Sequence, residues 1–114
     1  MLSTGTVFIF ATREGMDQSG NTCSTRVRVL TREGLHARPA SQIADMLSRH
    51  NARLTLVRDG EDPCSADCSS ILDMLVLAAG FNSELSLVAE GPDAREALTE
   101  VSGFFARKFD QKEF

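Results

Sequence analysis

A histidine and an arginine stand two positions apart where a helix is predicted to begin, in the segment G-L-H-A-R-P-A of residues 34–40. The unpaired N–H groups and the dipole of a helix N-terminus attract anions. They also disfavour a charged imidazolium, which keeps a histidine such as His36 neutral and nucleophilic. Arg38 carries a fork of donors that fits a phosphate. These residues suit a histidine that accepts a phosphoryl group and passes it on.

The same two residues also have a plainer interpretation. His36 would then be an ordinary polar residue at the helix start, and Arg38 a solvated charge. A histidine and an arginine near the start of a helix are common, so spacing alone favours this interpretation.

The helix that would position His36 follows from the apolar residues at 37, 40, 43, 44 and 47. This spacing predicts a helix from residue 37 to about residue 48. Pro39 fits only the first turn, where its missing N–H costs nothing. His36 therefore stands at or beside the N-cap.

The rest of the chain reads as further strands and helices in the order β-α-β-β-α-β-α. Alternating apolar residues predict strands, and Asp59-Gly60 predicts a turn before a third strand. Ser70 and Gly91-Pro92-Asp93 mark the starts of two more helices. The predicted elements are strands at 26–30 and 53–58, a third strand after residue 60, a strand at 84–89, and helices starting at residue 70 and near residue 93, the last ending near residue 108.

This order predicts an α+β open-faced β-sandwich, in which a four-stranded antiparallel sheet carries three helices on one face. Residues 26–114 are predicted to form this domain. Residues 1–25 read as an N-terminal extension of linker-like, flexible composition, rich in Gly and Ser.

Composition excludes several classes of protein. The chain has 114 residues, 42% of them hydrophobic, which is enough for one domain with a real core. A net charge of −4 disfavours non-specific binding of nucleic acid. No apolar run approaches the ~18 residues that a membrane span needs. The first residues lack the basic region of an export signal, so we expect a cytoplasmic protein with reduced thiols.

Residues 34–40 resemble the active-site motif of HPr, the histidine-containing phosphocarrier of the phosphoenolpyruvate:sugar phosphotransferase system. They match the family pattern Gly-Leu-His-x-Arg-Pro-Ala at every fixed position, which is a highly specific similarity. Ser70-Ile71-Leu72 is similar to a second landmark of the family, and residues 86–91 are similar to its last strand and turn. The resemblance covers about residues 26–108, and the predicted order of elements is the family's order.

The resemblance implies a phosphocarrier, which is a phosphoryl-transfer intermediate and not an enzyme, with no metal or cofactor. It implies that enzyme I phosphorylates His36 on a ring nitrogen (Nδ1 in the family). Arg38 would pair with the phosphate, and enzyme IIA-type domains of sugar permeases would accept it. The family further implies a monomer.

The resemblance also implies a regulatory site and a docking surface. Ser70 stands where a serine kinase, countered by a phosphorylase, modifies many relatives. Partner-binding residues would be Ala37, Ile71, Leu72 and Leu75. From the residues alone, Ser70 could serve only as a helix cap, and the three apolar residues could belong to the core. We expect Ile71 and Leu72 to be exposed and Leu75 or its neighbours to be partly buried.

The chain departs from the family around this second helix. Ser69 replaces a usually basic residue, Asp73 replaces Lys or Gly, and the 61–69 loop is about three residues longer. Relatives join an apolar patch to a basic rim that meets acidic partners, so this change weakens electrostatic steering. The alternative is an HPr-like regulatory protein, controlled by serine phosphorylation or acting in a nitrogen-type phosphotransfer chain.

The cysteines and the second histidine suggest two other kinds of site. Cys64 and Cys68, with Cys23 and His50, could bind zinc, although their spacing is unusual and no motif supplies the fourth ligand. Free thiols, or a redox-sensitive Cys64–Cys68 pair, are the competing interpretation. His50 is expected to be exposed at the end of the first long helix. A small-ligand binding module is a further alternative, but the chain has no Gly-rich phosphate loop.

Overall fold

The computed structural model describes residues 22–110. The elements follow the predicted order, with one short 3₁₀ turn added at the end. They are β2 (Thr22–Arg28), α1 (Ala37–Leu47), β3 (Arg53–Arg58), β4 (Cys64–Asp67), α2 (Ile71–Leu77), β5 (Glu84–Glu90), α3 (Ala94–Ala106) and η2 (Lys108–Asp110).

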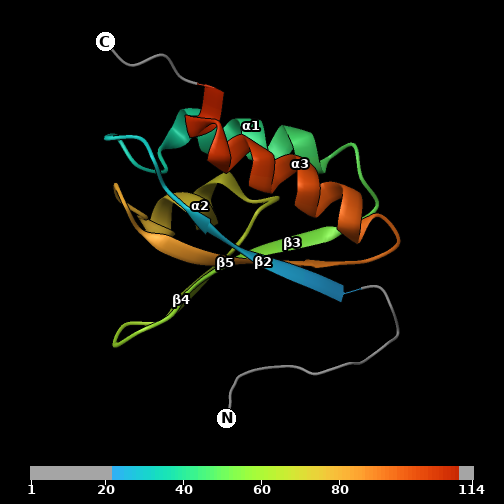
Figure 1. Cartoon of the computed structure of the whole chain (residues 1–114), viewed down its shortest axis with the longest axis horizontal. Helices are drawn as coiled ribbons and strands as arrows, with labels where there is room; N and C mark the ends of the chain where they lie inside the picture. Colours follow the sequence, from blue (N-terminus) through green and yellow to red (C-terminus); the bar gives the residue numbers. More distant parts are fainter. Residues whose placement is uncertain (1–21, 111–114) are drawn as a thin grey trace.

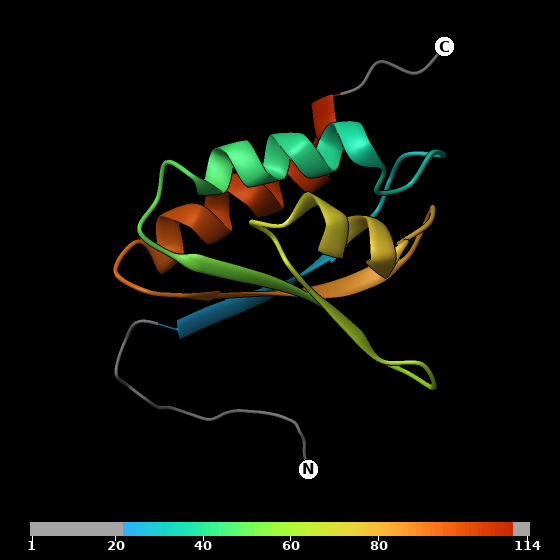
Figure 2. The ribbon, with the colours of Figure 1, turned by 180° about the vertical axis from the view of Figure 1, so that it is seen from behind.

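The four strands form one sheet in the order β2-β5-β3-β4, and all neighbouring strands are antiparallel. All three helices cover the same face of this sheet (Figures 1 and 2). Along β5, alternate residues Leu85, Leu87 and Ala89 point toward the helices and are fully buried. The predicted open-faced sandwich is therefore confirmed.

The first strand begins earlier than its sequence pattern suggested. It was expected at residues 26–30 but spans Thr22–Arg28, because residues 22–25 pair with Leu87–Glu90 of β5. Val27 and Val29 are buried, as expected. The boundary between residues 25 and 26 stays a prediction, and residues 1–21 of the predicted extension lie outside the described residues.

The weakly predicted third strand is β4, at the edge of the sheet. Pro63 directly precedes it and closes the 59–63 connection from β3. An edge position is where a sheet tolerates a proline beside a strand. The long loop predicted at 61–69 thus contains the four residues of β4.

The last helix ends at Ala106, two residues before the expected end. Residues 108–110 take positive φ values of 56° to 58°, which turns the chain back toward the core. Phe109 is buried there, with its ring centroid 4.9 Å from that of Phe105 and 5.3 Å from that of Phe104. This aromatic cluster closes the core at the C-terminal end of α3.

Candidate functional site

His36 is the N-cap residue of α1. Its backbone is extended, with φ −111° and ψ −170°, and its side chain makes no capping hydrogen bond to the helix. The imidazole is half-buried, whereas Ala37 and Arg38 on the first turn are exposed. The predicted position of His36 at the helix start is confirmed, and its ring does not serve as a polar cap.

A tight turn delivers the chain to His36. Gly34 has φ +73°, and its N–H donates to the carbonyl of Thr31 at 3.0 Å. Thr31 is fully buried, and its Oγ1 donates to the Gly34 carbonyl at 3.4 Å. A glycine is needed here because other residues adopt this left-handed conformation only at a cost.

The same turn lies directly against the segment that follows α2. The N–H of Leu35 donates to the carbonyl of Ala79 at 2.8 Å. A Cβ placed on Gly34 would lie 2.6 Å from that carbonyl oxygen and 3.0 Å from the Cα of Gly80. The backbone beside His36 and the end of α2 are therefore one packed unit.

Ser70 is the N-cap of α2, and the capping bond is as predicted: its Oγ accepts from the N–H of Asp73 at 3.1 Å. In a capping box, the acidic side chain three residues after the N-cap reaches back to the N–H of the N-cap residue. Asp73 does not do this. The Asp73 carboxylate accepts from the N–H of Asp67 at 3.2 Å, not from that of Ser70. The reason is that the Ser70 N–H already donates to the Asp67 carbonyl at 2.9 Å.

Two carboxylates, those of Asp67 and Asp73, therefore lie at the start of α2. Besides Asp73, Asp67 accepts at Oδ1 from the N–H and the Oγ of Ser69, at 2.9 and 2.8 Å. These two hydrogen bonds hold the pKa of the Asp67 carboxyl below its ordinary value. Asp67 and Asp73 give this end of α2 a negative rim.

The outer face of α2 is apolar. Met74 and Leu77 pack into the core, whereas Ile71, Leu72 and Leu75 are 40, 71 and 37% exposed. Ile71 and Leu72 are exposed, as expected. Leu75 is exposed to nearly the same extent as Ile71, and the burial expected for Leu75 or its neighbours is found at Met74. We call Ile71, Leu72, Leu75 and Val76 the α2 patch.

Two exposed apolar residues escaped sequence reasoning. Val76 is 73% exposed on α2, and Phe81 is 56% exposed in the loop before β5. Val76 follows Leu72 by four residues, which places both on one side of the helix. Phe81 directly follows Gly80 in the turn between α2 and β5.

The carboxyl end of α2 is held from the sheet. The Arg58 Nη1 of β3 donates to the carbonyl of Leu77 at 2.6 Å, where a cation also suits the helix dipole. Ala78 follows in the left-handed region with φ 53°. Arg58 thus holds the end of α2 in place, directly before Ala79, whose carbonyl accepts from the Leu35 N–H.

The cysteines are free thiols, as one of the interpretations expected, and Cys64 and Cys68 do not form a disulfide. Cys64 begins β4 and Cys68 follows its end, so an extended chain separates them by ~13 Å, too far for a disulfide. Cys68 is fully buried, and this burial raises its pKa to about 12, which makes the thiol unreactive. Across residues 22–110, no three His, Cys, Asp or Glu side chains are placed to hold a metal ion.

His50 lies beyond the end of α1, as expected, but it is not exposed. Its side chain is 18% exposed, and its Nε2 lies 2.7 Å from Oε1 of Glu100 on α3. Arg49 also pairs with Glu100, at 3.3 Å. These contacts lower the pKa of the Glu100 carboxyl. His50 thus joins two helices at the end of α1 opposite His36.

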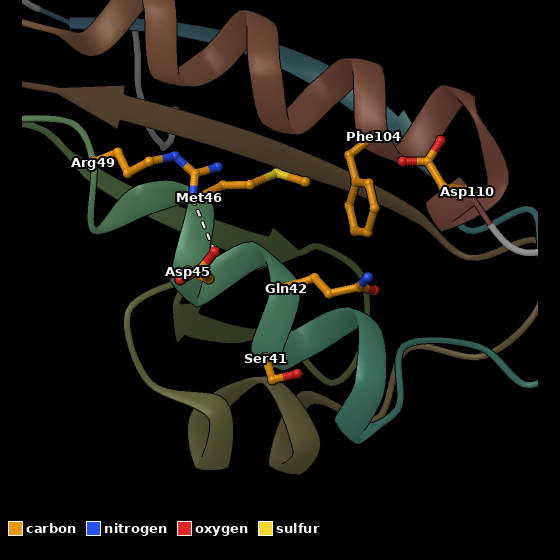
Figure 3. A pocket seen from close by; sticks show the side chains of 7 residues that line it. All are labelled: Ser41, Gln42, Asp45, Met46, Arg49, Phe104 and Asp110. Atoms are coloured by element: carbon orange, nitrogen blue, oxygen red, sulfur yellow. Dashed lines mark hydrogen bonds and ion pairs between the residues drawn. The ribbon is translucent and has the colours of Figure 1, made fainter.

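A pocket of about 340 Å³ lies along α1 and is also lined from α3 and η2. Figure 3 shows the side chains that line it. The Asp45–Arg49 ion pair, at 2.9 Å, lies across one part of it. None of the predicted site residues is among its lining residues, which are Ser41, Gln42, Asp45, Met46, Arg49, Phe104 and Asp110. His36 therefore lies outside this pocket, and its neighbours Ala37 and Arg38 are exposed.

A half-buried histidine at a helix N-terminus, followed by an exposed arginine, fits a protein that carries an anionic group. No helix in the described part of the chain is long and apolar enough to cross a bilayer.

Comparison with known proteins agrees with this class. The family model described as the phosphorylation site of the HPr component of the phosphotransferase system matches residues 23–107. The phosphocarrier protein HPr of Treponema pallidum is 43% identical over 86 residues, covering 75% of this chain and 94% of the relative. The phosphocarrier protein NPr of Shewanella violacea is 35% identical over 86 residues, covering 75% and 91%. The crystal structure of HPr from Bacillus anthracis superposes with a TM-score of 0.65 at 31% identity, covering 73% of this chain and 95% of its own.

The chain belongs to the HPr family of phosphocarrier proteins. It is a phosphocarrier of the phosphotransferase system, a transfer intermediate and not an enzyme.

Proposed function

We propose that His36 is the residue that carries the phosphoryl group. The observation that supports this most is its place at the N-cap of an 11-residue helix, half-buried and followed by the exposed Ala37 and Arg38. In the first turn, the N–H groups of Ala37 and Arg38 could donate to a phosphate on the ring, whereas Pro39 has no N–H and that of Ala40 donates to the His36 carbonyl at 3.0 Å. The helix dipole favours the negative charge of the phosphate. The phosphoryl group must also leave His36 again. Donors at an accessible helix terminus stabilise it and still let an acceptor protein reach it.

Arg38 is the proposed partner of the phosphate. It stands two residues into α1 and is exposed, and no ion pair to a carboxylate is found for it among the described residues. Its guanidinium would approach a phosphoryl group on His36 and stabilise charge as the group transfers.

Replacing Arg38 with alanine is expected to slow phosphoryl transfer tenfold or more, or ~1.4 kcal/mol of barrier. The free energy of unfolding should stay within about 1 kcal/mol of the wild type, because the side chain is exposed. Transfer rates and thermal melts of the same preparation measure both quantities. An unchanged rate with a lower melting temperature would show that Arg38 is structural.

The proposed donor is enzyme I and the proposed acceptors are enzyme IIA-type domains, as membership of the HPr family implies. Each partner must bring its own reacting group to the same ring nitrogen, so both must approach the face that carries His36. The α2 patch and Ala37 lie on this face, since α2 ends against the Gly34 turn. We propose that they form the docking surface. A monomeric state and a cytoplasmic location stay predictions.

Ser70 is the proposed site of regulation by a serine kinase. Its hydroxyl caps α2, and a phosphate at an N-cap is favoured by the helix dipole. Asp67 and Asp73 oppose this, because a phosphate would stand next to two carboxylates. The negative rim is also the observation that favours the alternative function, a regulatory relative whose docking surface has diverged from that of sugar carriers.

Replacing Ser70 with aspartate is expected to weaken binding of enzyme I several-fold, a cost of ~1 kcal/mol or somewhat more, through added repulsion at the docking surface. Ser70→Ala should bind as the wild type does. Titrations at low and moderate salt measure both, since salt screens the repulsion. Equal affinity for all three proteins would mean that Ser70 is only a helix cap.

The proposed function is tested by incubating the chain with phosphoenolpyruvate and enzyme I. The expected product carries one phosphoryl group that is labile in acid and stable in base. Adding an enzyme IIA-type domain should then remove it. A phosphoryl group stable in acid would contradict a phosphohistidine.

A further inference from the structure

The loop between α2 and β5 is held rigidly although its side chain at position 81 is exposed. The N–H of Asn82 donates to the carbonyl of Val29 at 2.7 Å, and the N–H of Val29 donates to that of Ser83 at 2.9 Å. The Arg28 Nη1 donates to the Asn82 carbonyl at 2.9 Å. These bonds fix the loop to the end of β2, so Phe81 is displayed from a defined position.

This loop lies beside the turn that carries His36. In both views of the molecule, the loop before β5 and the loop before α1 lie side by side (Figures 1 and 2). The contact is close, because a Cβ on Gly34 would lie 3.0 Å from the Cα of Gly80. Phe81 therefore directly follows Gly80, whose Cα lies against the turn that leads to His36.

Phe81 is 56% exposed, which leaves more than half of an aromatic side chain in water. Every other phenylalanine in the described residues is buried in the core. Rigidly presented aromatic residues are the usual anchors of protein interfaces, since they bury a large area for little conformational entropy. The phosphoryl donor must approach His36 closely and so must cover this neighbouring surface.

We propose that Phe81 is a specificity-determining residue for phosphoryl transfer. It inserts into an apolar pocket of the donor protein, enzyme I, and orients that protein over His36. The inference rests on the proposed function of His36 and names a contact next to it. With Phe81, the proposed docking surface extends from the α2 patch across the Gly34 turn.

The test is the rate of phosphoryl transfer from enzyme I at varied concentrations of this chain. Phe81→Ala should raise KM about tenfold or more, the effect of losing a modest aromatic anchor, and leave kcat nearly unchanged. Phe81→Leu keeps an apolar side chain and should recover most of the loss. The matched control is Leu98→Ala, a half-buried residue of α3 close in sequence to Glu100, at the end of α1 opposite His36. It should lower the melting temperature without changing KM.

The outcomes separate the two proposals. A raised KM for Phe81→Ala, with no such change for Leu98→Ala, supports the role of Phe81. If the wild type and Phe81→Ala are both phosphorylated on His36 and have the same KM, the role proposed for Phe81 is wrong. The proposed function of His36 then still stands. A wild-type chain that takes no phosphoryl group on His36 contradicts the proposed function and the role of Phe81 with it.

Discussion

A Gly34→Ala chain is expected to lose about 2 kcal/mol or more of its free energy of unfolding. Alanine in the left-handed region costs ~1–2 kcal/mol, and disturbing the Leu35–Ala79 hydrogen bond adds ~1 kcal/mol. The added Cβ would lie 2.6 Å from the Ala79 carbonyl oxygen, so the turn or the end of α2 must move. Chemical denaturation measures this loss.

Gly34→Ala should also slow phosphoryl transfer, and by much more than the smaller fraction of folded protein would explain. A displacement of ~1 Å at a reacting group can reduce a rate ~100-fold, and the Gly34 turn sets the position of His36. Gly91→Ala is a matched control, since Gly91 has φ +116° and a Cβ there would lie 2.9 Å from the carbonyl oxygen of Asn51. Asn51 follows His50, at the opposite end of α1 from His36, so this variant should lose stability and keep its transfer rate. Equal rates for the two variants would contradict a positioning role for the Gly34 turn.

The elements around His36 were predictable from local sequence. The apolar spacing after His36 sets α1, and Pro39 in the first turn sets where it begins. The capping bond of Ser70 was predictable for the same reason, because the residues involved are three positions apart. Each of these features depends on backbone and side chains within a single turn of helix.

The features that sequence reasoning missed depend on contacts between distant segments. Gly34 carries a clear turn signal, but nothing local shows that Ala79 lies against it. The start of β2 at Thr22 depends on pairing with β5, since residues 22–25 show no apolar alternation. His50 was expected in water because its partner, Glu100, is fifty residues away on α3.

The second large effect is expected at His36 itself. His36→Ala should abolish phosphorylation by phosphoenolpyruvate and enzyme I, because no other group at the start of α1 can serve as the nucleophile. The fold should persist, since His36 is only half-buried and is not part of the hydrophobic core. Circular dichroism and transfer assays on one preparation measure both outcomes.

The matched control is His50→Ala, since His36 and His50 are the two histidines of the chain. This variant removes a half-buried contact with Glu100 and should lower stability by ~1 kcal/mol, as for one lost hydrogen bond. Its phosphorylation should be unchanged. The pair therefore separates the loss of an imidazole in general from the loss of the one at the N-cap of α1.

The intact mass of the three proteins, after incubation with phosphoenolpyruvate and enzyme I, tests the role of His36 most directly. The wild type and His50→Ala should each gain the mass of one phosphoryl group, and both should lose it in acid. His36→Ala should gain none. Two results would contradict the assignment of His36 as the carrier. One is a phosphoryl group on His36→Ala, and the other is a folded His50→Ala protein that gains no phosphoryl group.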